Sequence, residues 1–245
     1  MDLRFDGRVV LVTGAGQGQG AAFARRLAAE GATTIGLDVT PEPVEELPGV
    51  DYRQLDVTDA QAWKDLDLDR VDGLVCNAGI TWRARLGDVD PAGLARVHEV
   101  NVTGTVLGIQ TVTPLMTAGG AIVVIGSVAA LSGHYPLAYT ASKWALRGVA
   151  KAASLELGPR RIRVNTVHPG FIATPMTASA PPEFRASNLA ETPLGRLGTV
   201  EDIVPIVTFL LSDDASYITG AEIAVDGGMS AHGGVKSISD ALRST

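Results

Sequence analysis

The sequence predicts an α/β fold, a single domain built on a doubly wound, parallel sheet of about seven strands. Short β-rich runs alternate with longer helix-like segments along most of the 245 residues, which is typical of a parallel sheet covered by helices. Hydrophobic residues make up 46% of the chain, so it can bury a sizeable core. No internal repeat or change in composition divides the chain, and we therefore expect one domain over residues 1–245.

The expected strands are short apolar runs that carry many β-branched residues. In chain order they are Val9–Thr13, Thr33–Leu37, Tyr52–Leu55, Gly73–Cys76, Ala121–Ile125, Ile162–Val167 and Ala221–Val225. An alanine-rich helix, Ala21–Glu30, is expected after the first strand, and a long helix is expected over Tyr139–Leu157. The segment from Thr58 to Leu66 leaves room for only two or three turns, so one crossover helix should be short.

Residues at the ends of the expected helices support these boundaries. Thr58–Gln61 and Thr199–Asp202 resemble capping boxes, and Asp90 precedes a proline suited to a first helical turn. Gly31 and Gly158 are placed to end helices. These signals indicate separate helices between strands, as the fold class requires.

A proline-rich stretch from Thr174 to Pro193 lies between the sixth strand and the next helix. Pro175, Pro181-Pro182 and Pro193 interrupt both the helical and the strand periodicity there. We expect this stretch to be a mobile loop, and we predict a substrate lid around residues 174–198.

The composition excludes several classes of protein. The net charge of −7 argues against nucleic acid as a main partner, and a single cysteine, Cys76, excludes an internal disulfide framework. The first six residues lack the basic start of a secretory signal, and the uncharged stretch Val100–Ser142 contains too many polar residues and breaks for a membrane span. We therefore expect a cytoplasmic protein with a small-molecule substrate and no membrane or nucleic-acid partner.

A glycine-rich segment, Thr13–Gly20, joins the first strand to its helix. Glycines in this context let backbone N–H groups approach a diphosphate at the helix N-terminus, whereas the same glycines alone would also suit a flexible turn. Asp38 ends the next strand, where its carboxylate can accept hydrogen bonds from ribose hydroxyls, although it could also cap the turn before Pro41. Together they predict a Rossmann-type domain that binds NAD.

A second group of residues suits acid/base chemistry. Tyr139 and Lys143 are four residues apart on an expected helix, so phenol and ammonium share one face. A phenol becomes an effective acid/base near neutral pH only if positive charge stabilises its phenolate. Ser127 follows the fifth strand, where its hydroxyl can hold a carbonyl oxygen against the phenol. Asn101 lies in a helical run, and its residue type alone indicates a surface or helix-distorting position.

With these motifs, the chain resembles the short-chain dehydrogenase/reductase family over essentially its whole length. The resemblance rests on a combination of motifs: Thr13-Gly14-x-x-x-Gly18-x-Gly20, Asn77-Ala78-Gly79, Asn101, Ser127, Tyr139-x-x-x-Lys143 and Pro169-Gly170. Within the family it resembles the bacterial 3α(20β)-hydroxysteroid dehydrogenases. The resemblance implies an NAD(H)-dependent enzyme that interconverts a secondary alcohol and a ketone, with a hydroxysteroid-like or other hydrophobic compound as substrate.

The resemblance also implies roles for individual residues. Tyr139 would exchange the proton, Lys143 would lower the pKa of Tyr139 and hold the nicotinamide ribose, Ser127 would orient the carbonyl, and Asn101 would hold a water. The cofactor-binding set is Gly14, Gln17, Gly18, Gln19, Gly20, Asp38, Asp56, Val57, Asn77, Ala78, Gly79, Tyr139, Lys143, Pro169, Gly170, Ile172 and Thr174. Family members form tetramers, and the small residues of Tyr139–Leu157 favour packing between subunits, so we expect a homo-oligomer, a tetramer or a dimer.

Three departures from the family pattern concern Cys76, Gln19 and the spacing of Ser127 and Tyr139. Cys76 replaces an asparagine, Gln19 replaces an aliphatic residue, and the segment from Ser127 to Tyr139 is one residue shorter than usual. The first two positions contact ligands mainly through backbone atoms. The shortened segment bears on the shape of the pocket, and His134 within it is either a loop residue or a substrate contact.

Two other functions remain open on the sequence. A 3-oxoacyl-carrier-protein reductase would share the motifs, but it usually uses NADP(H) and needs basic surface for its acidic carrier, which Asp38 and the net charge disfavour. A nucleotide-sensing regulator without chemistry should have lost Tyr139 or Lys143. No metal site is expected, because the histidines are far apart and the triad Asp65, Asp67 and Asp69 lacks the glycine and glutamate of a calcium loop.

Overall fold

Seven parallel strands form one sheet in the computed structural model, which describes residues 3–117 and 119–243. The strand order is β3-β2-β1-β4-β5-β6-β7. The strands are β1 Val9–Thr13, β2 Thr33–Asp38, β3 Val50–Gln54, β4 Gly73–Cys76, β5 Gly120–Ile125, β6 Ile162–Pro169 and β7 Glu222–Val225. The predicted α/β sheet of seven strands is confirmed, and each strand end lies within two residues of its predicted position.

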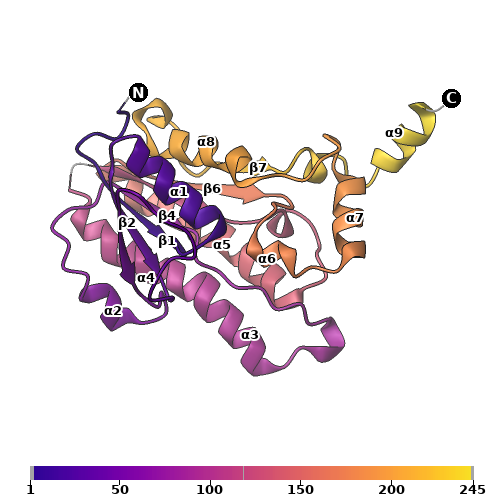
Figure 1. Cartoon of the computed structure of the whole chain (residues 1–245), viewed down its shortest axis with the longest axis horizontal. Helices are drawn as coiled ribbons and strands as arrows, with labels where there is room; N and C mark the ends of the chain where they lie inside the picture. Colours follow the sequence, from indigo (N-terminus) through magenta and orange to yellow (C-terminus); the bar gives the residue numbers. More distant parts are fainter. Residues whose placement is uncertain (1–2, 118, 244–245) are drawn as a thin grey trace.

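Helices pack on both faces of the sheet (Figure 1). The helices are α1 Gly18–Ala29, α2 Ala60–Lys64, α3 Pro91–His98, α4 Gly104–Val112, α5 Leu137–Leu157, α6 Pro175–Ala178, α7 Pro182–Glu191, α8 Val200–Leu211 and α9 Lys236–Arg243. Helices α1 and α8 cover one face, while α2, α4 and α5 cover the other. The crossover helix α2 is short, as predicted.

The alternation of side chains along each strand divides the core in two. In β1, Val10 and Val12 pack with Phe23 of α1 and Val207 of α8, whereas Leu11 belongs to the opposite cluster, with Trp63 of α2. Successive side chains of a strand point to opposite faces, so a strand covered on both sides is apolar throughout. This explains why the central strands are continuous apolar runs.

The helix ends correct two details of the prediction. The side chain of Asp59, not that of Thr58, caps α2 by accepting from the backbone of Gln61 and Ala62. Helix α1 begins at Gly18, three residues before the predicted start, because glycines open it and give no hydrophobic signal. The capping box at Thr199 and the cap at Asp90 are present as predicted.

The segment predicted as a proline-rich loop contains two helices, α6 and α7. Pro175 and Pro182 stand at their first positions, where a missing N–H costs no helical hydrogen bond and the fixed φ suits a helix start. The prolines therefore begin helices here instead of interrupting them. The lid predicted around residues 174–198 stays a prediction.

The strand order reverses between β1 and β4, which are neighbours in the sheet although β2 and β3 separate them along the chain. In open α/β sheets such a reversal leaves a crevice at the carboxyl ends of the strands. The glycine-rich turn after β1 and the residues after β4, β5 and β6 all lie at that edge. The fold thus brings the predicted site residues together.

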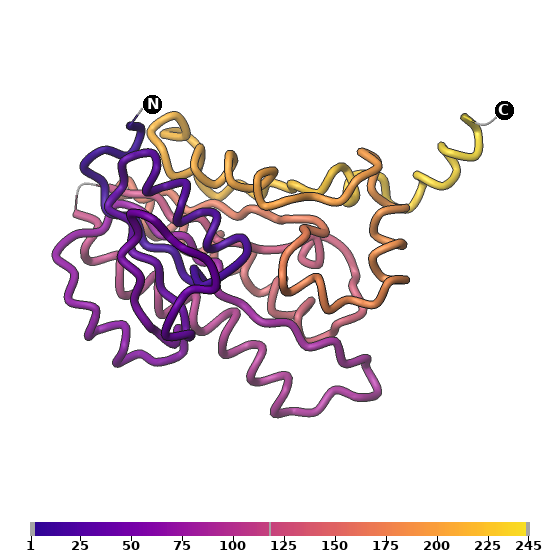
Figure 2. The backbone as a smooth tube through the Cα atoms, viewed as in Figure 1, coloured from indigo at the N-terminus to yellow at the C-terminus, as the bar shows by residue number. Residues whose placement is uncertain are grey.

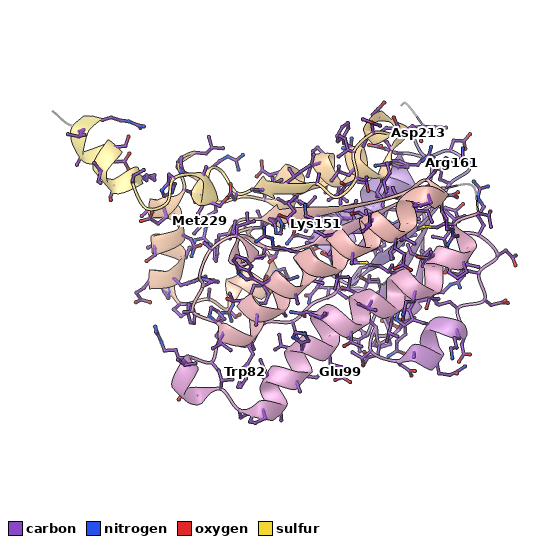
Figure 3. The ribbon with its side chains drawn as sticks, turned by 180° about the vertical axis from the view of Figure 1, so that it is seen from behind. Trp82, Glu99, Lys151, Arg161, Asp213 and Met229 are labelled. Carbon is purple, nitrogen blue, oxygen red and sulfur yellow. The ribbon has the colours of Figure 1, made fainter. Side chains whose placement is uncertain are left out.

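Two outer features complete the architecture. Seen from behind, α5 and the α3–α4 pair run side by side across the back of the molecule, with Lys151 marking α5 and Glu99 the junction of α3 and α4 (Figure 3). Helix α9 projects away from the body near the C-terminus (Figure 2). No helix in the described ranges 3–117 and 119–243 has the length and apolar character needed to cross a membrane.

Candidate active site

The glycine-rich turn after β1 is shaped by close backbone approaches. A Cβ on Gly20 would lie 1.9 Å from the carbonyl oxygen of Gly14, and one on Gly14 would lie 2.9 Å from Cα of Ala78. Gly14 also has a φ of +67°, which an L side chain rarely adopts. Gln17 caps α1 without a side-chain hydrogen bond, so the N-terminal end of this helix is open for an anion.

Asp38 at the end of β2 holds this turn in place. One carboxylate oxygen accepts from the backbone N–H of Gly16 at 2.8 Å, and the other accepts from the N–H and hydroxyl of Thr40, each at 3.0 Å. The alternative interpretation, a turn cap before Pro41, is therefore correct for one oxygen. Asp38 also lines the cleft beside the turn, so its half-buried carboxylate remains open to a further donor.

That cleft, called here the main cleft, has a volume of about 300 Å³ and follows the carboxyl edge of the sheet. Most of the predicted cofactor-binding residues line it: Gly14, Gln17, Gly18, Gln19, Asp38, Asp56, Val57, Asn77, Ala78, Gly79, Tyr139, Lys143 and Thr174. Arg96 lines it too, within 4.0 Å of Asp56, and the sequence analysis missed this cation because its position in α3 carries no motif.

Four predicted cofactor residues lie outside the lining of the main cleft. Gly20 is buried in the first turn of α1, and Pro169 is buried at the end of β6. Gly170 and Ile172 line a separate cavity of about 130 Å³. Their roles stay predictions, and the packing shows why Gly20 must be glycine without any contact to a ligand.

The main cleft contains one buried polar atom without a partner, the side-chain Oε1 of Gln19. An unpaired buried acceptor is costly unless a ligand or water completes it. Together with the uncapped start of α1 and the Asp38 carboxylate, it fits a dinucleotide, which presents phosphates, ribose hydroxyls and a carboxamide. Where the family pattern has an aliphatic side chain, this residue of the cleft lining therefore carries a buried acceptor that lacks a partner.

Asn77 joins the ends of β1 and β4. Its side-chain amide donates to the carbonyl oxygens of Thr13 and Gly14 at 3.0 and 3.2 Å, and the Thr13 hydroxyl accepts from the N–H groups of Asn77 and Ala78. The preceding Cys76 is buried in the core, where desolvation raises the pKa of its thiol to about 12. The cysteine packs as an apolar residue and leaves the Asn77 contacts intact.

Asn101 is fully buried in a π-helical turn, Glu99–Thr103, between α3 and α4. Its side chain accepts from the N–H of Ile80 at 2.8 Å and donates to the carbonyl of Ile80 and to the hydroxyl of Ser142. The π-helical turn confirms the helix-distorting interpretation, and the full burial of Asn101 shows that the surface interpretation is wrong. Three hydrogen bonds offset the cost of burying the amide. Asn101 thereby connects the loop after β4 to α5, and its proposed water stays a prediction.

Tyr139 and Lys143 of α5 meet in the main cleft. Nζ of Lys143 lies 5.6 Å from the centre of the Tyr139 ring and donates to the carbonyl of Ile125 at 2.9 Å. Burial raises the pKa of Tyr139, and a hydrogen bond with Ser127 works in the opposite direction. Burial lowers the pKa of Lys143 to about 8. The lowering of the phenol pKa by Lys143, which the resemblance implies, stays a prediction.

A second hollow, called here the side cavity, has a volume of about 90 Å³ and opens at Tyr139 and Ser127. It is lined by Thr81, Arg83, Ser127, Val128, His134, Tyr135, Pro136, Tyr139, Gly170, Phe171, Met176, Thr177, Phe184 and Asn188. His134, left open by the sequence, therefore lies on its wall. The main cleft and the side cavity share Tyr139 and Met176, so the phenol stands where the two hollows meet.

His168 of β6 supports Ser127 from below. Its Nδ1 lies 3.1 Å from the carbonyl oxygen and 3.3 Å from the amide nitrogen of Ser127. A Cβ on Gly126 would lie 2.4 Å from Nδ1 of His168, so only glycine fits between them. The predicted packed strand-end histidine is confirmed by its full burial. Sequence reasoning missed its contact with Ser127, since no spacing rule links residues 41 positions apart.

More than nine tenths of the chain is similar to oxidoreductases of known sequence. A family model described as enoyl-(acyl carrier protein) reductase matches residues 14–230. The 3-alpha-(or 20-beta)-hydroxysteroid dehydrogenase of Mycobacterium bovis is 39% identical, covering 93% of this chain and 91% of the relative. The trans-4-hydroxycyclohexanecarboxylate dehydrogenase of Sinomonas cyclohexanicum is 38% identical, with 91% and 93% covered. The 3-oxoacyl-acyl-carrier-protein reductase of Thermotoga maritima is 40% identical, with 93% and 99% covered.

Solved structures show the same fold. The crystal structure of levodione reductase superposes with a TM-score of 0.88 at 32% identity and covers 94% of this chain and 100% of its own. A provisionally named NAD(P)-dependent gluconate 5-dehydrogenase from Beutenbergia cavernae, with NADP bound at low occupancy, also has a TM-score of 0.88, at 34% identity, with 94% and 99% covered. Both the dehydrogenase/reductase resemblance and the similarity to hydroxysteroid dehydrogenases are confirmed.

Proposed function

Because the chain belongs to the short-chain dehydrogenase/reductase family, whose members here are oxidoreductases of alcohols and ketones, we propose that it interconverts a secondary alcohol and a ketone with NAD(H) as cofactor. One observation carries the proposal. Tyr139 lines both the main cleft and the side cavity, so a cofactor in the first and an alcohol in the second would meet at its phenol. A binding protein without chemistry has no need of an acid/base at that junction.

In the direction of oxidation, Tyr139 as a phenolate takes the hydroxyl proton of the alcohol. The carbinol C–H bond breaks with its electron pair leaving as hydride, and the C–O bond becomes a carbonyl. Nicotinamide bound in the main cleft supplies the hydride acceptor. Ser127, which lines the side cavity together with Tyr139, holds the oxygen as charge develops on it. The Lys143 ammonium, 5.6 Å from the ring centre, stabilises the phenolate.

Preference for NAD(H) is proposed from Asp38. Its carboxylate lines the main cleft at the end of β2, where it would accept from ribose hydroxyls and repel a 2′-phosphate. The residues that follow, Val39 to Glu42, include no lysine or arginine to neutralise such a phosphate. Arg96 also lines the cleft, but it lies 3.1 Å from Glu99 and 4.0 Å from Asp56, so its charge is already balanced.

We propose a single-ring alcohol as substrate. Two relatives are named for ring alcohols, a hydroxycyclohexanecarboxylate and a hydroxysteroid. The side cavity of about 90 Å³ is smaller than the roughly 150 Å³ of a cavity that holds benzene, so a single ring fills it and extends into the adjoining main cleft. The fused rings of a steroid exceed that space unless α6 and α7 move away.

A second candidate is 3-oxoacyl-carrier-protein reduction, which the relative from Thermotoga maritima favours. It would require NADP(H) and a basic docking surface, whereas Asp38 and a net charge of −7 oppose both. A nucleotide-sensing regulator is disfavoured because Tyr139 and Lys143 are both present and lie in one cleft. Activity with acetoacetyl thioesters and NADPH exceeding that with ring alcohols and NAD would establish the reductase instead.

Tyr139→Phe tests the proposal, with Tyr135→Phe as the matched control. Tyr135 also lines the side cavity but is not followed by a lysine at the fourth position. Loss of the acid/base should lower kcat for ring-alcohol oxidation at least about 100-fold in the first variant and leave the second within about tenfold of wild type. NADH binding, followed by fluorescence, should persist in both. Residual turnover near wild type in Tyr139→Phe would refute the assignment.

A further inference from the structure

The side cavity carries charge of one sign. Arg83 is the only charged side chain among its described lining residues, and none of those residues is an aspartate or glutamate. Within the ranges 3–117 and 119–243, no salt bridge joins Arg83 to an acid. A half-buried guanidinium without a carboxylate, on the wall of a cavity, is a ready site for an anion.

Arg83 is held in place but not saturated. One terminal nitrogen donates to the hydroxyl of Ser179 at 3.1 Å, and the other donates to the carbonyl of Met176 at 2.9 Å. A guanidinium has five N–H donors, so further donors remain after these two bonds. Both partners are neutral, and the positive charge is left for a ligand. The loop that carries Arg83 is marked in Figure 3 by its neighbour Trp82.

Aromatic rings form the rest of the wall. The ring of Phe184 lies 5.7 Å from that of Tyr135 and 5.6 Å from that of Phe171, measured between centres, and His134 stacks 5.4 Å from Phe184. Such a wall favours an apolar ring as occupant. The same cavity therefore offers a phenol and a serine hydroxyl for a carbinol, an apolar wall, and one unpaired cation.

On the basis of the proposed function, we propose that the substrate is a hydrophobic ring alcohol that also carries a carboxylate, and that Arg83 binds this carboxylate. The carbinol lies at Tyr139 and Ser127, and the ring lies against Phe171 and Phe184. Arg83 thus sets specificity between charged and neutral alcohols, and it takes no part in the transfer of the proton or hydride.

A purely structural role for Arg83 makes a different prediction. Its hydrogen bonds to Met176 and Ser179 connect the loop after β4 to the segment that includes α6. In a purely structural role, Arg83 would only hold this segment in position. Loss of such a fastening would weaken charged and neutral substrates alike. Loss of a carboxylate contact would weaken only charged substrates, so the ratio between the two separates the roles.

The experiment compares 4-hydroxycyclohexanecarboxylate with its methyl ester and with cyclohexanol, in NAD-dependent oxidation by the full-length protein. The variants are Arg83→Gln and, as control, Arg85→Gln. Arg85 is exposed two residues away, lies over the Tyr135 ring at 5.4 Å and does not line the side cavity. Both variants remove one positive charge, so only Arg83→Gln tests a direct contact. Inhibition by cyclohexanecarboxylate against cyclohexanecarboxamide gives a binding readout that needs no turnover of the inhibitor.

The wild-type protein should oxidise 4-hydroxycyclohexanecarboxylate with a higher kcat/KM than its methyl ester. Arg83→Gln should raise KM for the acid about 10- to 100-fold, with cyclohexanol and the ester changed less than about threefold, and Arg85→Gln should change none of them by more than threefold. Cyclohexanecarboxylate should lose inhibition in parallel. Equal use of acid and ester by wild type, or an equal loss for both in Arg83→Gln, would overturn this inference alone. If wild type binds NADH but oxidises none of the alcohols, the proposed function fails and the inference fails with it.

Discussion

Replacing Lys143 with methionine should remove a pH dependence from the stability of the fold. The side chain of Lys143 is 5% exposed, and its ammonium donates to the carbonyl of Ile125. Within the described parts of the chain it forms no salt bridge with an acid. Desolvation of this buried charge lowers its pKa from 10.5 to about 8. The folded state therefore holds the Lys143 proton less tightly than the unfolded chain does.

The sign of the effect follows from proton binding in the two states. Below pH 8 both states carry the proton, so the folded protein bears the full cost of the buried charge. Between pH 8 and 10.5 the unfolded chain keeps a proton that the folded protein has lost, and the free energy of unfolding rises with pH. At 1.36 kcal/mol per pKa unit, the rise between pH 7 and 9.5 amounts to about 2 kcal/mol. Methionine has no proton to lose, so the variant should lack this rise.

Urea denaturation at pH 7 and pH 9.5, followed by tryptophan fluorescence, measures the difference. The comparison uses wild type, Lys143→Met and Lys151→Met at one protein concentration and without cofactor. Lys151 lies on the same helix with an exposed side chain, so its removal should leave the pH dependence of wild type unchanged. The lost hydrogen bond to Ile125 affects the variant at both pH values and cancels in the difference, as do the titrations of groups remote from Lys143.

Wild type and Lys151→Met should each gain about 2 kcal/mol more than Lys143→Met between the two pH values. A pH dependence that is the same in all three proteins within about 0.5 kcal/mol would refute the reasoning. It would show that the Lys143 ammonium is hydrated in solution, and the electrostatic description of the site would then need revision.

Cofactor preference should depend on Asp38: wild type should favour NAD over NADP at least about 100-fold in kcat/KM, equivalent to about 2.7 kcal/mol, and Asp38→Asn should narrow that ratio. A wild-type ratio near one would mean that the carboxylate does not face the ribose. Hydrogen exchange in residues 174–198 should slow when NAD and a substrate analogue are both bound, and equal protection with and without them would argue against a lid. Light scattering at micromolar concentration should show at least a dimer, because α5 exposes Trp144 and Leu155, and a monomer would contradict this.

The fold was predictable because its signals are local and repeated. A strand buried on both faces must be a continuous apolar run, as β1 and β5 are, and short runs separated by helix-length segments leave few topologies. The errors occurred where a residue type has two structural uses. Pro175 and Pro182 can break a helix or begin one, and Thr58 and Asp59 are capping residues in adjacent positions, so the residue types alone do not distinguish the two uses.

The site was predictable only in part, for a physical reason. Tyr139 and Lys143 share a helix, so their spacing alone places them together. The walls of the side cavity come from segments far apart in the chain, such as Arg83 after β4 and Phe184 in α7. No local pattern encodes their approach, because tertiary packing creates it. The contact of His168 with Ser127 was missed for the same reason.

Burial of the proposed acid/base pair has a consequence for the pH dependence of the reaction. The same desolvation raises the pKa of Tyr139 and lowers that of Lys143, so it opposes charge on both groups. A phenolate and an ammonium are nevertheless more favourable together than apart. With the 5.6 Å from Nζ to the ring centre taken as the scale of their separation, and an effective dielectric constant of about 20, their attraction is about 3 kcal/mol. An attraction of that size exceeds the 1.36 kcal/mol that corresponds to one pKa unit, so the two groups titrate as one system. A pH profile of kcat/KM therefore reports the pair and not Tyr139 alone. Lys143→Met should therefore move the profile as a whole toward higher pH, since the remaining phenol keeps only the effect of burial and of Ser127.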